Sequence, residues 1–263
     1  MKAVRTIILK EWADIRRNKL VFSVVIGVPL LMVLIPVVML FIMSRAPVDS
    51  RDLEELSRML QNTLFTGMDG REALQAAMAS NFMILFLMMP LMVPVTIAAY
   101  SIVGEKITRS LEPLLATPVS TAQLLLGKGL AAALPGIVMT WFSYAVFLVF
   151  ARLFAVSDRV FSVFVNPMWL IAMFVLSPLL TVMAVNVGII VSSRTSDPRA
   201  AEQLGSLIIL PLMVLFIGVM AGFIMLSSTT FWLSSLIVLV LDAGLLYLGV
   251  TLFQRETILT RWK

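Results

Sequence analysis

A polar stretch from Gly104 to Lys128, between two long uncharged segments, holds the residues whose types and spacing best fit a chemical role. Its leucines recur at three- and four-residue spacing, and charged side chains such as Lys106, Arg109 and Glu112 occupy other positions. A helix formed there would have one apolar face and one polar face. The stretch therefore predicts a docking surface for a soluble partner.

Prolines and a capping pattern divide this stretch. Pro113 and Pro118 each bias the preceding residue away from helical angles, so they isolate the short segment between them. Ser120 and Gln123 have the spacing of a capping box, which predicts that a new helix starts there and contains Lys128. We expect a short rigid projection at the membrane surface; an ordinary, well-capped helical connector is the alternative.

Asp242 is the second candidate, because it is the only charged residue in the interior of a predicted membrane span, away from the span ends. An ionised carboxylate costs roughly 2.5–3.5 kcal/mol at such a position. It must therefore be protonated, hydrated in a pathway, hydrogen-bonded or matched by a cation. A hydrogen-bonded packing role is the alternative to a pathway role. The pathway candidates are Asp242, Asn186, Thr181 and Tyr144.

Composition removes most enzymatic chemistry. The 263 residues include no cysteine and no histidine, which excludes disulfides, thiol catalysis, the usual zinc sites and the usual general base. We predict no metal site and no catalytic residue. An intramembrane enzyme is the weaker alternative, since it would need paired carboxylates or a Ser/His couple within the spans.

These residues must be positioned by membrane helices. The chain is 60% hydrophobic and only 13% charged, and its uncharged runs are long enough to cross about 30 Å of hydrocarbon as helices. We predict an all-α integral membrane protein, a single transmembrane domain over 1–263. We expect residues 1–19 to form an amphipathic helix in the interface, with a simple anchoring segment as the alternative, and 45–80 to form a small external loop. The six predicted spans are 20–43, 81–103, 128–151, 167–191, 206–226 and 231–253.

The distribution of basic residues gives the orientation. With six spans, both termini and the Gly104–Lys128 stretch share one side, and that side holds 14 of the 20 lysines and arginines. The positive-inside rule therefore places both termini in the cytoplasm and the protein in the cell membrane. We interpret the net charge of +5 as basic residues that face the acidic lipids of the membrane surface on this side. We predict no nucleic-acid binding.

Three segments resemble one transporter family. The string EKITRSLEPLLATPVS (Glu105–Ser120), followed by LLLGK (Leu124–Lys128), resembles the signature of the second-type (ABC-2) permeases of ATP-binding-cassette exporters. The segment Ser192–Gly205 is similar to the family's Ala-x-Gln segment before span five. A basic N-terminal helix with Lys10-Glu11 is similar too. Among these permeases, the chain looks closest to the sodium-efflux and multidrug-like members.

The resemblance implies a permease subunit without a nucleotide site of its own, since Gly127-Lys128-Gly129 lacks other residues of a phosphate-binding loop. ATP and Mg would be bound by a separate pair of cytoplasmic ATPase subunits. Two permeases, identical or different, would form a dimer around the translocation pathway. A passive anchoring or assembly subunit is the alternative. The resemblance implies ATPase coupling through the 104–120 loop, at Glu105, Arg109, Leu111, Glu112, Leu115 and Pro118.

Overall fold

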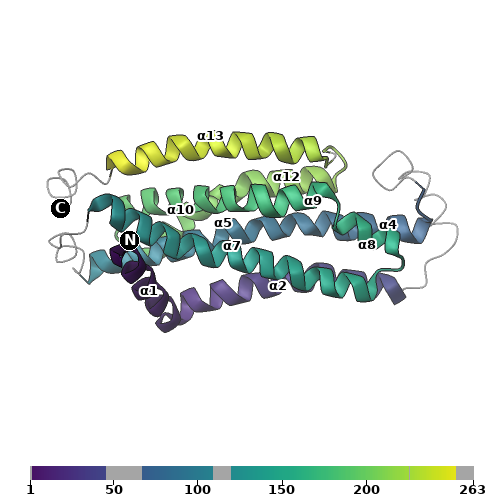
Figure 1. The fold of residues 1–263 in the computed structure, drawn as a ribbon, viewed down its shortest axis with the longest axis horizontal. Helices are drawn as coiled ribbons and strands as arrows, with labels where there is room; N and C mark the ends of the chain where they lie inside the picture. The colour runs from purple at the N-terminus through teal and green to yellow at the C-terminus, as the bar shows by residue number, and fades with distance from the viewer. Residues whose placement is uncertain (1, 46–66, 109–119, 225, 253–263) are drawn as a thin grey trace.

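The computed structural model describes residues 2–45, 67–108, 120–224 and 226–252. These residues form helices joined by short turns, with no strand among them, which confirms the all-α fold. Six helical segments are long and apolar enough to cross a membrane, as the hydropathy pattern predicts. They run roughly parallel to one another in an elongated bundle (Figure 1).

Several of the spans are built from more than one helical piece. The first is α2 (Lys19–Arg45), the third α7 (Thr121–Phe154) and the sixth α13 (Ser228–Leu252). The others change helix type or direction along their length. The second span joins α4 (Gly70–Met83), η1 (Ile84–Met88) and α5 (Met89–Ile107); the fourth joins α8 (Asp158–Phe164), α9 (Pro167–Ile171), η2 (Ala172–Leu176) and α10 (Ser177–Arg194); the fifth joins α11 (Pro198–Ser206), η3 (Leu207–Ile209) and α12 (Leu210–Met220).

The second span begins earlier than its predicted start at residue 81. The Asp69 side chain accepts a hydrogen bond from the amide of Gly70, and Glu72 accepts one from the amide of Asp69, so a capping box starts α4 there. Small residues such as Ala73, Ala76 and Ala79 are buried along it. Residues 70–80, predicted to lie in the external loop, therefore continue the helix of the second span.

Helix α5 is the packing centre of the bundle, and its span is the most buried of the six within the described residues. Three neighbouring elements approach it through glycines, where an added Cβ would lie only 2.7–2.8 Å from an α5 side chain. Close helix packing of this kind is typical of membrane proteins. The pairs are Gly136 of α7 with Pro94, Gly188 of α10 with Ala98, and Gly205 of α11 with Val95.

A turn separates the fifth and sixth spans. The predicted spans leave a break at residues 227–230; in the structure α12 ends at Met220, and α13 begins at Ser228. Gly222 has a φ of +76°, and the amide of Phe223 donates to the carbonyl of Gly218 over 2.9 Å. This geometry is a glycine-terminated helix end.

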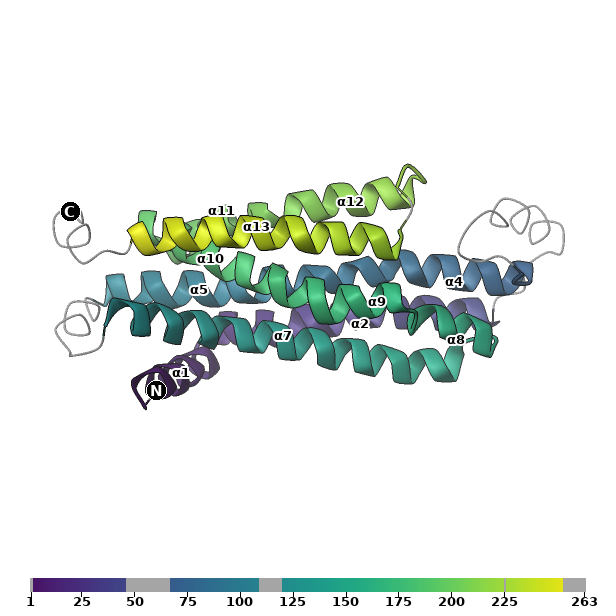
Figure 2. The same cartoon turned by 45° about the horizontal axis from the view of Figure 1, so that its top comes forward.

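Figures 1 and 2 both place α1 (Lys2–Arg17), the end of α5, the start of α7 and the end of α13 at one end of the bundle. We call this the N-terminal end. α4, α8 and the turn between α12 and α13 lie at the opposite end. Helix α1 crosses the direction of the spans instead of extending it, as an interface helix should.

Candidate functional site

Helix α1 forms the outer wall of the site. Its apolar side chains follow helical spacing, as predicted, and the more buried side of the helix includes Val4, Ile7, Ile8 and Trp12. The Trp12 indole donates a hydrogen bond to the carbonyl of Ala131 in α7, over 3.1 Å. This contact fixes the helix against the start of the third span.

A glycine permits this approach. A Cβ added at Gly127 of α7 would lie 2.8 Å from Cγ2 of Ile7 in α1, closer than carbon atoms can pack without a shift. Gly127 therefore brings the backbone of α7 close to α1. The residue that follows it, Lys128, is then directed into the space between α1, α5 and α7.

Lys128 is the centre of a buried charge cluster, which we define as Lys10, Glu11, Asp14, Glu105 and Lys128. Its ammonium lies 2.8 Å from Oε1 of Glu11 in α1 and 2.9 Å from Oε2 of Glu105 in α5. It also donates to the hydroxyl of Ser101 over 2.7 Å. The side chains of Glu11, Glu105 and Lys128 are all less than a tenth exposed, so the cluster is a structural joint between three helices.

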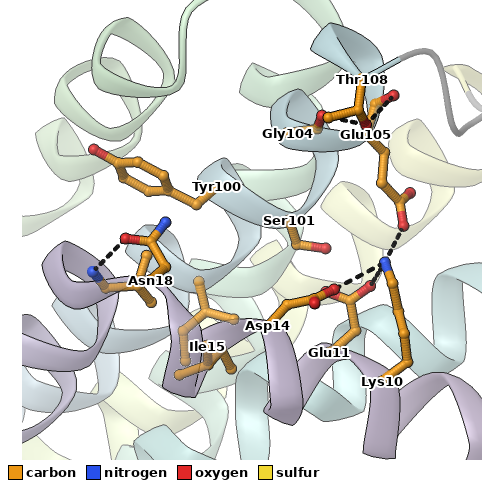
Figure 3. Close-up of a pocket in the computed structure, with 12 residues that line it drawn as sticks. Lys10, Glu11, Asp14, Ile15, Asn18, Tyr100, Ser101, Gly104, Glu105 and Thr108 are labelled. Carbon is orange, nitrogen blue, oxygen red and sulfur yellow. Dashed lines mark hydrogen bonds and ion pairs between the residues drawn. The ribbon is translucent and has the colours of Figure 1, made fainter.

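Lys10 completes the cluster from the outer side. Its ammonium lies 2.6 Å from Oε1 of Glu105, 3.2 Å from Oε1 of Glu11 and 3.3 Å from Oδ2 of Asp14 (Figure 3). Two lysines thus bridge the carboxylates of Glu11 and Glu105. The shared arrangement ties α1 to α5 twice, once through each lysine.

The two α1 residues are held in their charged forms. Burial alone would raise the pKa of the Glu11 carboxyl, but the charge of Lys128 and its hydrogen bond outweigh burial and hold that pKa below its ordinary value of 4.5. Burial likewise opposes the charge of Lys10, but its hydrogen bond to Glu105 and the nearby carboxylates raise its pKa above 10.5. Lys10 and Glu11 are therefore both charged across the physiological pH range.

A cleft of about 340 Å³ opens beside the cluster, between α1 and α5. Apolar residues, among them Ile15 and Ile97, line one part of it, and charged or polar residues such as Lys10 and Glu105 line another. Figure 3 shows the carboxylates of Glu11 and Asp14 converging on Lys10 from α1, with Glu105 facing them from α5.

Lys106, next to Glu105, binds the backbone at the end of α10. Its ammonium donates to the carbonyls of Ser192, Ser193 and Thr195, over 2.6, 2.8 and 3.1 Å. These carbonyls are at the C-terminus of α10, where a cation complements the helix dipole. Adjacent residues of α5 therefore connect to α1 and α7 in one direction and to the α10–α11 junction in the other.

The comparison with protein families covers most of the chain. The family described as ABC-2 family transporter protein matches residues 5–243. The chain belongs to this family. A search of curated proteins finds no match to the chain. As an ABC-2 transporter protein with six apolar helical segments, it is a multi-pass membrane subunit of a transporter and is not itself catalytic.

Only one of the six predicted coupling residues of this ABC-2 protein, Glu105, lies within the described part of the chain. Its carboxylate is buried in the charge cluster and faces α1 and α7. Lys10, Glu11 and Lys128 were not among the predicted site residues, although Lys10-Glu11 and Gly127-Lys128 both belong to the segments that resemble the family. The predicted residues outside the described part are Arg109, Leu111, Glu112, Leu115 and Pro118.

The four pathway candidates of the ABC-2 protein do not form one group. The Tyr144 hydroxyl donates to the carbonyl of Phe164 over 2.7 Å, and the Thr181 hydroxyl donates to the carbonyl of Ser177 over 3.0 Å. Both side chains are buried and hydrogen-bonded to backbone. Asn186 of α10 lies next to Asp242 of α13, so the structure brings together only these two.

Proposed function

We propose that this chain is the permease subunit of an ATP-driven exporter and that a separate cytoplasmic ATPase drives it through the 104–120 loop. The charge cluster is the observation that carries the proposal. α5 leads into residues 109–119 and α7 follows them, and Lys128 and Glu105 join these two helices to each other and to α1.

Force applied to this loop would reach the centre of the bundle. Glu105 and Lys106 are in α5, whose central part packs against α7, α10 and α11 through the three glycine contacts. Buried ion pairs and close packing transmit a displacement, because they do not deform continuously. A push on the loop would therefore move α5 relative to its neighbours, as alternating access requires.

The exposed helices leave room for a second permease. α2, the α11–α12 span and α13 are each largely unburied in this chain, and their apolar faces fit lipid or another permease. We propose a dimer, identical or mixed, around a shared pathway. ATP and Mg would bind only to the ATPase pair, and the excess of basic residues at the N-terminal end supports a cytoplasmic location for that end.

Substitutions in the loop test the coupling. Leu115→Arg or Glu112→Lys should abolish co-purification of the ATPase, or its stimulation by the permease, while membrane insertion is unchanged. Loss of one buried interface anchor commonly costs about 2 kcal/mol or more. The measurements are pull-down from membranes and ATP hydrolysis in reconstituted vesicles.

Matched controls lie at the opposite end of the bundle. Phe223→Arg and Asp158→Lys make similar changes at side chains that are 88% and 84% exposed, and they should leave ATPase binding intact. If the loop variants bind and stimulate the ATPase as well as the controls do, the loop does not couple the subunits. If transport continued unimpaired with either loop variant, the chain would be an anchoring subunit instead.

A further inference from the structure

Asp242 and Asn186 form a buried polar pair that the proposed coupling mechanism does not use. Asp242 lies in the interior of α13, 3% exposed, and Asn186 lies in α10, 8% exposed. The two side chains lie near each other, but no well-formed hydrogen bond joins either carboxyl oxygen of Asp242 or the amide nitrogen of Asn186 to a partner within the described residues. Native proteins rarely leave three such atoms without a partner.

Among the described residues, the helices that pack most closely on α13 place no cation at the depth of Asp242. The elements that pack most closely on α13 are α9, η2 and α10, and of these only α10 carries a charged residue, Arg194. Arg194 is eight residues beyond Asn186, about 12 Å along the helix axis. On α13 itself, the other titratable side chain, Tyr247, is 72% exposed. An ionised Asp242 would therefore be a buried, unpaired charge in the part of the chain that the structure describes.

A bound proton removes the cost of this buried charge, and it needs no additional space between the helices. A protonated carboxyl is neutral and has one O–H donor, and the side-chain carbonyl of Asn186 is an acceptor. A metal cation would need several oxygen ligands, and the described residues contain no group of three acidic side chains that could hold one. The pair offers one carboxyl and one amide, which match the needs of a proton.

We propose that Asp242 and Asn186 form a proton-binding site between α10 and α13, in which Asp242 is a carboxylic acid that donates to the carbonyl of Asn186. The proton comes from water and returns to water when the carboxyl ionises, so no other reactant is needed. Because ionisation requires hydration, release of the proton requires α13 to separate from α10. Occupancy of the site is thus linked to the contact between the fourth and sixth spans.

Infrared spectroscopy of the full-length chain in lipid nanodiscs tests the proposal, and it needs no ATPase. The wild type should show, at neutral pH, the carbonyl stretch of a protonated carboxyl, and Asp242→Asn should lack that band. Asp158→Asn, at the exposed Asp158, should retain it. Absence of the band in the wild type, or its loss on adding sodium at constant pH, would overturn the proposal.

A second measurement covers the case in which Asp242→Asn does not fold. Labelling of aspartate carboxyl carbons with ¹³C should shift the band to lower frequency in the wild type. Asn186→Leu, which removes the acceptor but keeps the branched shape and the number of heavy atoms, should shift it to higher frequency because the hydrogen bond is lost. A band that moves with neither change does not arise from this pair, and the site would be rejected. Failure of ATPase coupling would leave these results unchanged.

Discussion

Lys128 and Glu11, 117 residues apart in the sequence, form a buried ion pair with 2.8 Å between the ammonium nitrogen and Oε1. Each side chain is only 4% exposed, so neither can exchange its partner for water. The pair holds the interface helix α1 against the start of the third span. Because Lys128 also contacts Glu105, the same pair connects α1 to the last residues of the second span.

Removal of the shared cation should therefore be costly. Lys128→Met leaves the carboxylates of Glu11 and Glu105 with fewer partners, and loss of one member of a buried ion pair typically destabilises by about 3–5 kcal/mol. We expect a comparable fall in the free energy of unfolding in mixed micelles. Arg152→Met is the control, since Arg152 and its partner Asp158 are 60% and 84% exposed and such pairs contribute less than about 1 kcal/mol. Equal losses in both variants would contradict a buried role for the cluster.

Gly127 should be intolerant of even one methyl group. In Gly127→Ala the new carbon would lie 2.8 Å from Cγ2 of Ile7, and overpacking of this kind costs about 1–3 kcal/mol. Ile7→Ala in the same chain should restore part of the loss. The distance between α1 and α7 can be measured by electron paramagnetic resonance, with spin-labelled cysteines at the exposed positions Leu9 and Leu126 in a chain that has no native cysteine.

Gly104→Ala is the matched control for that experiment. No atom lies within 4 Å of a Cβ added at Gly104, and alanine is the better helix former, so stability should be unchanged or up to about 1 kcal/mol greater. If both alanine variants left the α1–α7 distance unchanged, Gly127 would not be required for the contact.

The contact between α1 and the spans should persist between about pH 4.5 and pH 10.5. These limits are the ordinary pKa values of Glu11 and Lys10, whose pKa values in the folded protein are lowered and raised, respectively. Glu11 has a lowered pKa, so its contribution is complete above 4.5 and is lost as the pH falls through its folded value. Lys10 has a raised pKa, so its contribution is complete below 10.5 and is lost as the pH rises through its folded value. The same spin-label distance should lengthen at both extremes. In Glu11→Gln the distance should no longer lengthen at acid pH through protonation of this residue. If the acid transition were unchanged, another group would be responsible for it.

The two ends of the bundle should differ in their access to the cytoplasm. Ser196 and Arg159 are both exposed, Ser196 at the α10–α11 junction and Arg159 in α8, and Figures 1 and 2 place these segments at opposite ends. In intact cells, a thiol reagent that does not cross membranes should label Arg159→Cys and spare Ser196→Cys. Both should react after the membrane is opened. Labelling of Ser196→Cys from outside would reverse the proposed orientation.

Local sequence signals determined much of this protein. Runs of apolar residues predict the six spans, because each residue adds to the preference of its own segment for hydrocarbon. The capping box at Ser120 and Gln123 is confirmed at the start of α7, with 3.2 Å in both hydrogen bonds. The amphipathic pattern of residues 1–19 likewise predicts α1. Such signals act within a few residues, so they can be recognised without knowledge of the fold.

Tertiary structure decided which distant residues meet. Nothing in the spacing of Lys10-Glu11, Glu105 and Lys128 fixes the rotation of three helices about their axes, and that rotation directs the four side chains toward one another. The pairing of Asp242 with Asn186, and the hydrogen bonds of Thr181 and Tyr144 to backbone instead, depend on the same rotations. Glycine contacts set how closely the helices approach. Hydropathy gives the membrane spans, but only the packing of helix against helix determines which polar groups find one another.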